Sequence, residues 1–325
     1  MRNEQHMTMM NTAVSIIIPH YNSADTLDRL LESIGNHSDV QVIVVDDNST
    51  KDIAVLRNLE KKYCNTVEFF RNDTGIQSAG ACRNVGLEKA QGGWVLFADA
   101  DDFFTKGWYE IASKYLYSDY DAIFFTPTSV FEDLKTVGIR HIGQEKMIGE
   151  YLANPSRENY MKCARIHCVW SKLFKRDVIE ENRCRCSETM HANDILMSKQ
   201  LFYFCKKKMF TKEVIYCVTK TNGSLTTIAS DMAFNERLNE FIKSYKFLES
   251  HFDKKDFEHI RMSGGKILYD AYKKGMRLNK LIRGAVELKK NNVRLVAKEY
   301  MSPAEFLKTY RVIKGEYKID EKHTV

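Results

Sequence analysis

Five aspartates follow directly after two apolar runs of this sequence, at residues 40–45 and 94–98. They are Asp46, Asp47, Asp99, Asp101 and Asp102. Carboxylates that share one site repel one another unless a cation neutralises them. Mg²⁺ and Mn²⁺ bind one or two protein carboxylates together with substrate phosphates. The pattern therefore predicts a site for one of these cations and a phosphorylated ligand. The alternative is that the aspartates cap helices and form turns, as single aspartates commonly do.

The apolar runs belong to an alternation of strand-like and helical patterns. We expect strands at residues 14–18, 40–45, 67–70, 94–98 and 121–125. Between them apolar residues recur at helical spacing, as at Leu27, Leu30, Leu31 and Ile34. Strands that are apolar on both faces and separated by helices are typical of a mainly parallel sheet covered on both sides. Ligands of such sheets bind beyond the carboxyl ends of the strands, where the aspartates lie.

The composition bounds the class of protein. A length of 325 residues with 44% hydrophobic and 28% charged residues excludes wholesale disorder and fibrous architecture. No apolar run reaches the roughly 18–20 residues of a membrane-spanning helix, and the N-terminus has no apolar signal core. We therefore expect a cytoplasmic protein. Its eight cysteines lack paired Cys-x-x-Cys spacing, so we expect reduced thiols rather than zinc ligands.

Three regions are expected: a flexible tail at residues 1–12, a ligand-binding and catalytic domain at 13–228, and a basic helical region at 229–325. Residues 231–325 hold 21 Lys and Arg against 14 Asp and Glu. These helices could lie peripherally on the anionic inner face of a membrane, or they could form a solvated packing domain. No nucleic-acid-binding motif accompanies the charge, so we expect no nucleic acid partner.

Three segments resemble the nucleotide-binding half of the family 2 glycosyltransferases, whose fold is called GT-A. They read SIIIPHYNSADTLDRLLESI, VIVVDDNST and GACRNVGLEKAQGGWVLFADADD. The resemblance covers about residues 14–105 with the order and spacing of the motifs intact, and continues more loosely to about residue 228. It implies an α/β GT-A fold with a Rossmann-like sheet. It also implies transfer of a hexose from a nucleotide diphosphate, expected to be UDP, to a bacterial polysaccharide or lipopolysaccharide acceptor.

By this resemblance the nucleotide is bound by Pro19, Tyr21, Asn22, Asp47, Arg83 and Asp99. The carboxylate of Asp47 can accept the imide N–H of uracil, and the ring of Tyr21 can pack beside the base. Asp99 and Asp101 match the family's Asp-x-Asp motif, which implies Mn²⁺ or Mg²⁺ as cofactor, with Asp101 as the ligand of the metal that bridges the diphosphate. The alternative for Arg83 is an ion pair on a helix surface.

The acceptor hydroxyl must lose its proton to a positioned base. Relatives use an aspartate from a Glu-Asp or Asn-Asp pair that opens a helix, and Asn193-Asp194 before the apolar residues 195–205 match that pair. A helix N-terminus stabilises the ionised carboxylate. The resemblance therefore implies that Asp194 is the general base of a single displacement that inverts the anomeric configuration. The alternative is an ordinary first-turn aspartate.

Four further residues are candidates for contacts with the acceptor or the diphosphate: Trp170, Glu188, His191 and Lys220. An aromatic face suits a sugar ring, although a tryptophan in an apolar strand is often a core residue. Relatives often carry Arg or His where this chain has Thr219 and Thr221, so Lys220 is the substitute we expect. The alternative function is a non-catalytic scaffold that binds nucleotide sugar or glycan. A nucleotidyltransferase is disfavoured, because no Gly-rich phosphate loop follows the first strand.

Overall fold

The computed structural model describes residues 12–220 and 230–296 of the chain. The tail expected at residues 1–12 lies outside these ranges apart from Thr12, and so does the boundary expected at residue 228. The division into a catalytic domain and a basic helical region therefore stays a prediction.

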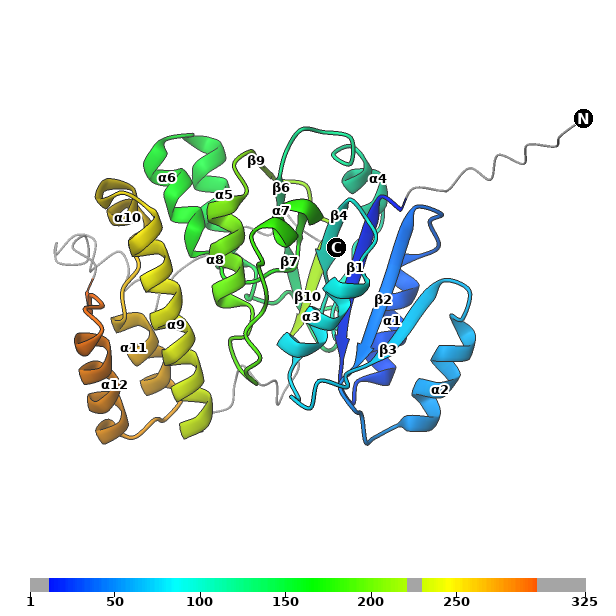
Figure 1. Ribbon diagram of the computed structural model, residues 1–325, viewed down its shortest axis with the longest axis horizontal. Coiled ribbons are helices and arrows are strands. Elements are labelled where there is room, and N and C mark those ends of the chain that lie inside the picture. The colour runs from blue at the N-terminus through cyan, green and yellow to red at the C-terminus, as the bar shows by residue number, and fades with distance from the viewer. Residues whose placement is uncertain (1–11, 221–229, 297–325) are drawn as a thin grey trace, which may run out of the picture.

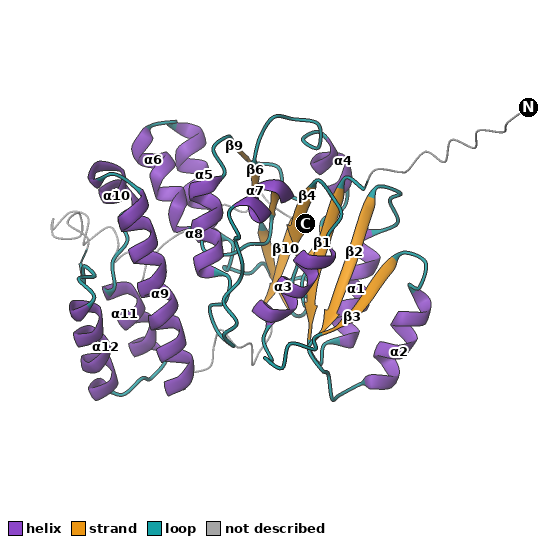
Figure 2. Cartoon of the chain, viewed as in Figure 1, coloured by secondary structure: helices purple, strands orange, loops and turns teal. Residues whose placement is uncertain are grey.

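One group of parallel strands in the large sheet comes from the first hundred residues (Figures 1 and 2). In sheet order its strands are β3 (Val67–Arg71), β2 (Val40–Asp46), β1 (Val14–His20) and β4 (Trp94–Phe97). β1 pairs in parallel with both β2 and β4, and His20 lies opposite Asp46. The carboxyl ends of β1 and β2 therefore finish side by side, as the positions of the aspartates predict.

The remaining strands complete a seven-stranded sheet and a smaller three-stranded one. The large sheet continues from β4 with β8 (Lys172–Lys175), β6 (Ala122–Phe125) and β9 (Lys208–Thr211), and the small sheet contains β5 (Phe103–Phe104), β10 (Tyr216–Lys220) and β7 (Thr128–Phe131). β8 runs antiparallel to both of its neighbours, whereas the other pairs of the large sheet are parallel. The prediction of a mainly parallel sheet is confirmed. β10 pairs with β5, which brings Tyr216 opposite Phe104 and close to the aspartates after β4.

Helices cover both faces of the large sheet. Figure 1 shows α3 in front of the strands and α1 behind them. The helices of this region are α1 (Ala24–Ile34), α2 (Ile53–Lys62), α3 (Ala79–Lys89), α4 (Trp108–Ser113), α5 (Ile142–Ala153), α6 (Arg157–Lys162), α7 (Arg176–Glu181) and α8 (Ile195–Phe204). α3 packs closely on β1, because a Cβ at Gly86 would lie 2.4 Å from the Ile17 side chain.

The C-terminal helices stand together at one end of the molecule, with α9 packed against α8 (Figure 1). They are α9 (Asp231–His251), α10 (Lys254–Ile260), α11 (Gly265–Lys273) and α12 (Leu278–Lys290). The pattern over residues 256–275 predicts one helix, and this is wrong, because Arg261 adopts a left-handed φ of 57°. The N–H groups of Gly264 and Gly265 then bond to the carbonyls of Arg294 and Leu295, at 2.7 and 2.8 Å.

Two expectations from composition can be compared with the structure. All eight cysteines are free, and all but Cys64 are buried, as expected for reduced thiols. Among the helices at residues 12–220 and 230–296, none combines the length and apolar character needed to cross a bilayer.

Candidate active site

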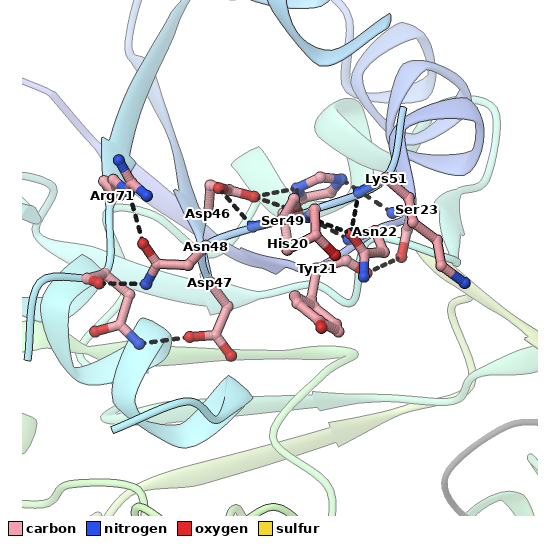
Figure 3. A network of polar contacts seen from close by, with 12 residues as sticks. His20, Tyr21, Asn22, Ser23, Asp46, Asp47, Asn48, Ser49, Lys51 and Arg71 are labelled. Atoms are coloured by element: carbon pink, nitrogen blue, oxygen red, sulfur yellow. Dashed lines mark hydrogen bonds and ion pairs between the residues drawn. The ribbon is translucent and has the colours of Figure 1, made fainter. Parts of the chain in front are cut away.

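The turn after β1 is locked to the end of β2 (Figure 3). The Ser23 N–H donates to His20 Nε2 at 3.2 Å, so His20 Nδ1 carries the proton and donates to Asp46 Oδ1 at 2.9 Å. The Ser49 hydroxyl donates to the same oxygen at 2.5 Å. Burial alone would raise the pKa of Asp46, but the bonds from His20 and Ser49 lower it below its ordinary value. Asp46 is therefore an ionised carboxylate that holds two loops together.

Asn22 fixes the same turn, next to Tyr21 (Figure 3). Asn22 has a left-handed φ of 52°, and its Oδ1 accepts the N–H groups of Thr50 and Lys51 at 2.8 and 2.9 Å. Its own N–H donates to the Ser49 hydroxyl at 2.8 Å. Tyr21 is 45% exposed. An exposed ring on a rigid turn is the arrangement that packing against a nucleotide base requires.

Asp47 lies buried behind this turn and is bound by a residue that the sequence analysis missed. Asn72 Nδ2 donates to Asp47 Oδ1 at 2.5 Å and to the Ile76 carbonyl at 2.9 Å. Burial raises the pKa of Asp47, although the bonds from Asn72 and Cys82 oppose the shift. Asn72 directly follows β3, so the rule that points to strand ends could have found it.

Pro19, the remaining residue predicted from this turn, lies within β1 opposite Val45.

The three aspartates after β4 form one cluster. Asp99, Asp101 and Asp102 each offer a carboxylate oxygen, and these oxygens lie within 4.8 Å of one another. Both oxygens of Asp102 are occupied, because the Tyr216 hydroxyl donates to Oδ2 at 2.8 Å and the Thr219 N–H to Oδ1 at 2.7 Å. The Tyr216 hydroxyl also accepts the Asp99 N–H at 2.8 Å. The Tyr216 hydroxyl thus fixes Asp102 and Asp99 relative to each other. No local sequence pattern identifies Tyr216 as part of the site.

Asp101 differs from Asp99 and Asp102 in the partners of its carboxylate. Burial raises its pKa to about 6 and Asp99 adds to this, while Arg140 and Arg29 oppose the rise. Within the described ranges its carboxylate receives no side-chain hydrogen bond, and the Arg29 guanidinium bonds instead to its backbone carbonyl. A divalent cation would relieve this crowding of oxygen ligands. The cluster therefore fits Mg²⁺ or Mn²⁺, with Asp101 and one oxygen of Asp99 as the available ligands.

Arg83 links this cluster to the predicted base. Its Nη2 lies 2.5 Å from Asp99 Oδ1, and its Nη1 lies 2.7 Å from Asn193 Oδ1. Burial alone would lower the pKa of Arg83, but the charges of Asp99 and Asp194 and the hydrogen bond to Asp99 act together against it, and the pKa is raised. The arginine is therefore a buried bridge and not the surface ion pair that the alternative described.

Asp194 occupies the N-cap position of α8 and is partly exposed. Its side chain makes no capping hydrogen bond, so the carboxylate is not used to hold the helix. Burial and the charge of Asp99 raise its pKa, and the charges of Arg83 and Lys172 oppose this. The structure therefore brings the predicted base within electrostatic reach of the predicted metal cluster, although 92 to 95 residues separate them in sequence.

The four candidates for the acceptor or diphosphate lie in different surroundings. Trp170 is buried and stacks on Tyr216 with ring centroids 5.8 Å apart. His191 is buried and pairs with Glu236, whereas Glu188 is exposed in the same loop.

Lys220 ends β10 with Nζ over the Phe131 ring, 5.1 Å from its centroid. Thr221, at the other place where relatives carry Arg or His, lies outside the described residues.

Comparison with known proteins gives the family of the chain. The family described as Glycosyl transferase family 2 matches residues 15–182, more than half of the chain. The chain belongs to this family. It is 25% identical over 259 residues to the glycosyltransferase YibD of Escherichia coli. The aligned residues cover 74% of this chain and 72% of YibD. It is 25% identical over 232 residues to the cholesterol galactosyltransferase of Borreliella burgdorferi, which covers 67% and 63%. It spans 61% of the length of a Bacillus subtilis relative.

Two of the solved structures that share the fold contain a nucleotide sugar. One is S. aureus TarS in complex with UDP-GlcNAc, with a TM-score of 0.57, 19% identity and coverage of 86% of this chain and 89% of that chain. The other is the mannosyltransferase PcManGT of Pyrobaculum calidifontis in complex with GDP-Man and Mn²⁺. Its TM-score is 0.53, with 15% identity and coverage of 94% and 81%. The GT-A prediction is confirmed.

Proposed function

We propose that this chain transfers a hexose from a UDP-sugar to a hydroxyl of a bacterial glycan or glycolipid, with inversion at the anomeric carbon. The observation that carries the proposal is the bridge formed by Arg83. It joins Asp99, in a carboxylate cluster suited to a divalent cation, to Asn193, next to the candidate base Asp194. Donor-side and acceptor-side chemistry thus meet at one edge of the sheet.

Asp101 and Asp99 would hold Mn²⁺ or Mg²⁺, and Asp102 would orient the cluster through its bonds to Tyr216 and Thr219. A bound divalent cation supplies Lewis-acid stabilisation of the departing diphosphate. PcManGT, which shares the fold, was solved with Mn²⁺, and this supports the choice of metal. Lys220 is the proposed additional cation for the diphosphate.

Asp194 is proposed to accept the proton of the acceptor hydroxyl. As the acceptor oxygen forms its bond to the anomeric carbon, the bond from that carbon to the diphosphate oxygen breaks, and the proton passes to the Asp194 carboxylate. Its raised pKa favours this role, because a base is most effective when its pKa approaches the working pH. Trp170, Glu188 and His191 stay proposals for the acceptor side, and His191, three residues before Asp194 in sequence, is held by Glu236.

The preference for uridine rests on Asp47 and Tyr21. A buried carboxylate at the base of the turn can accept the imide N–H of uracil, and the exposed Tyr21 ring can cover the base. Pro19 and Asn22 shape the turn that presents them. TarS, which shares the fold, binds UDP-GlcNAc, and this supports a uridine donor here.

The C-terminal region is proposed to contact the anionic inner face of a membrane, where lipid-linked acceptors would be found. On α12, Leu278, Ile282 and Val286 are 71%, 56% and 48% exposed, and Arg283 is exposed beside them. Residues 262–296 contain nine Lys and Arg against two Asp and Glu. Basic helices with exposed apolar side chains bind anionic bilayers. The name of the Borreliella relative states a lipid acceptor for that protein.

The test separates an enzyme from a binding scaffold. The wild-type chain, Asp194→Asn and the control Asp119→Asn, at an exposed residue paired with Lys207, are incubated with a panel of UDP-sugars, GDP-mannose, glycan acceptors and Mn²⁺. We expect transfer by the wild type and the control, and a loss of at least about a hundredfold in Asp194→Asn with UDP binding retained. Binding without turnover in the wild type would favour the scaffold.

A further inference from the structure

The loop that leads into Asp194 is held from both sides. In Figure 1 the segment between α7 and α8 runs between α3 and α9. On the α3 side, Asn84 Nδ2 donates to the Cys186 carbonyl at 3.0 Å, and Asn84 Oδ1 accepts the Cys186 N–H at 2.9 Å. A Cβ at Gly80 would lie 2.0 Å from the Ser187 carbonyl oxygen, so α3 touches the loop backbone there. This side belongs to the part of the chain that the family match covers.

The α9 side contributes two carboxylates. Glu236 Oε2 accepts the His191 N–H at 2.9 Å and lies 2.8 Å from His191 Nδ1. One helix turn further, Glu240 Oε2 accepts the Ser187 hydroxyl at 2.6 Å. The two contacts are four residues apart on both the helix and the loop, so together they fix the position and direction of the segment that ends at Asp194.

Burial makes these contacts more than surface ion pairs. The Glu240 side chain is 1% exposed, and its other oxygen pairs with Lys243 at 2.7 Å. His191 is 6% exposed. A buried carboxylate that loses a hydrogen-bond or ion-pair partner destabilises the folded state. The folded chain therefore favours the geometry that keeps both partners of Glu240 in place. Neither contact touches the metal cluster, so their effect on chemistry must pass through the loop.

We propose that Glu236 and Glu240 of α9 are positioning residues that hold Asp194 against the carboxylate cluster, so that the C-terminal helices are part of the catalytic apparatus. The inference rests on the proposed function of Asp194. It goes beyond the family match, which ends at residue 182 and includes neither the loop nor α9. Small displacements of a reacting group reduce the rate strongly, because the reactive geometry must be held before reaction.

The experiment compares Glu236→Ala, Glu236→Gln and Ser187→Ala in the full chain. Glutamine keeps an oxygen that can accept both His191 donors, so it should rescue what alanine loses. Glu249→Ala is the matched control, because Glu249 lies on the same helix, is exposed, and pairs only with Lys246 among the described residues. Each variant is assayed well below its own unfolding midpoint, with UDP-sugar and Mn²⁺.

Glu236→Ala should lower kcat by about ten- to a hundredfold with the donor KM within about twofold of wild type. Ser187→Ala should show a smaller loss, and Glu236→Gln and Glu249→Ala should behave like wild type. Hydrogen–deuterium exchange of residues 187–194 should rise in Glu236→Ala and not in the control. Unchanged exchange or unchanged kcat in Glu236→Ala would overturn the inference. A loss of donor binding as large as the loss of kcat would also overturn it. A wild-type chain without transfer would instead overturn the proposed function, while the exchange readout still tests the contact.

Discussion

Arg83 Nη1 lies 2.7 Å from Asn193 Oδ1, although 110 residues separate the two in sequence. The same guanidinium is 2.5 Å from Asp99 Oδ1, so one buried side chain of α3 holds the predicted metal cluster and the loop of the predicted base at fixed separation. A displacement of α3 would therefore move the donor side and the acceptor side of the site together, because Arg83 contacts both.

Replacement of Arg83 should lower the stability of the folded chain. In Arg83→Met, Asp99 and Asn193 lose their buried partner, which should reduce the free energy of unfolding by about 1–3 kcal/mol. Urea denaturation measures this loss. The double mutant with Asn193→Ala should be less destabilised than the sum of the single mutants, by about 0.5–3 kcal/mol. Additivity of the two changes would show that the bridge is energetically unimportant.

The base preference should depend on Asp47. In Asp47→Asn the side-chain amide can donate to N3 of cytosine, whereas the carboxylate of the wild type suits the N3–H of uracil. We therefore expect UDP to bind about ten- to a hundredfold more weakly, and CDP to lose much less affinity. Isothermal titration calorimetry with both nucleotides and Mn²⁺ measures the ratio.

Asp73→Asn serves as the control for Asp47→Asn, because Asp73 is exposed and lies beside Asn72, the partner of Asp47. The same loss for UDP and CDP would mean that Asp47 does not read the base.

Local patterns were sufficient to predict the parallel strands and the aspartates at their ends. β4 and the central residues 16–18 of β1 and 42–45 of β2 are apolar runs, and the rule for parallel sheets assigns the ligand site to one edge. The same rule, applied to the third strand, would have found Asn72. The break at Arg261 escaped prediction, because it depends on carbonyl groups of Arg294 and Leu295 that are distant in sequence.

The residues that orient the predicted site residues could not be predicted from the sequence. Tyr216 holds Asp102 from a strand that begins 114 residues later, and Glu236 holds His191 from a helix on the far side of the loop. Such pairs depend on tertiary packing, and a single tyrosine or glutamate in a regular element gives no local signal. Sequence alone therefore identified candidate groups and not the contacts that orient them.

The exposed face of α12 should bind anionic vesicles. We expect the chain to sediment with phosphatidylcholine vesicles that contain phosphatidylglycerol, and less so as salt rises, because salt screens the basic side chains. Ile282→Glu with Val286→Glu should abolish this binding, since both side chains are exposed and the change opposes apolar and electrostatic attraction. Transfer to a soluble acceptor should be unaffected.

Tyr117→Glu is the matched control for the α12 variant, because Tyr117 is fully exposed and lies outside the C-terminal helices. Equal sedimentation of the α12 variant and the wild type would place any membrane contact elsewhere, and equal binding to vesicles without phosphatidylglycerol would exclude an electrostatic contribution.

Stability should rise with pH because of Lys199 on α8. Its side chain is buried, and burial lowers its pKa to about 7, with the charge of Lys172 acting in the same direction. Between about pH 7 and the ordinary lysine pKa, the unfolded chain binds a proton that the folded chain does not, so the free energy of unfolding increases with pH across this window. Below pH 7 both states are protonated, and the folded state bears the full cost of a buried charge.

Lys199→Met removes that cost and should raise the unfolding midpoint, with a larger gain at pH 6 than at pH 10. The substitution leaves no orphan carbonyl, because Ile166 O accepts the Ser198 hydroxyl at 2.9 Å as well as Lys199 Nζ at 2.8 Å. Thermal unfolding at a series of pH values measures the difference between variant and wild type. A gain that does not vary with pH would indicate improved packing and not the removal of a buried charge, and a loss at pH 6 would show that the Lys199 hydrogen bond outweighs its desolvation.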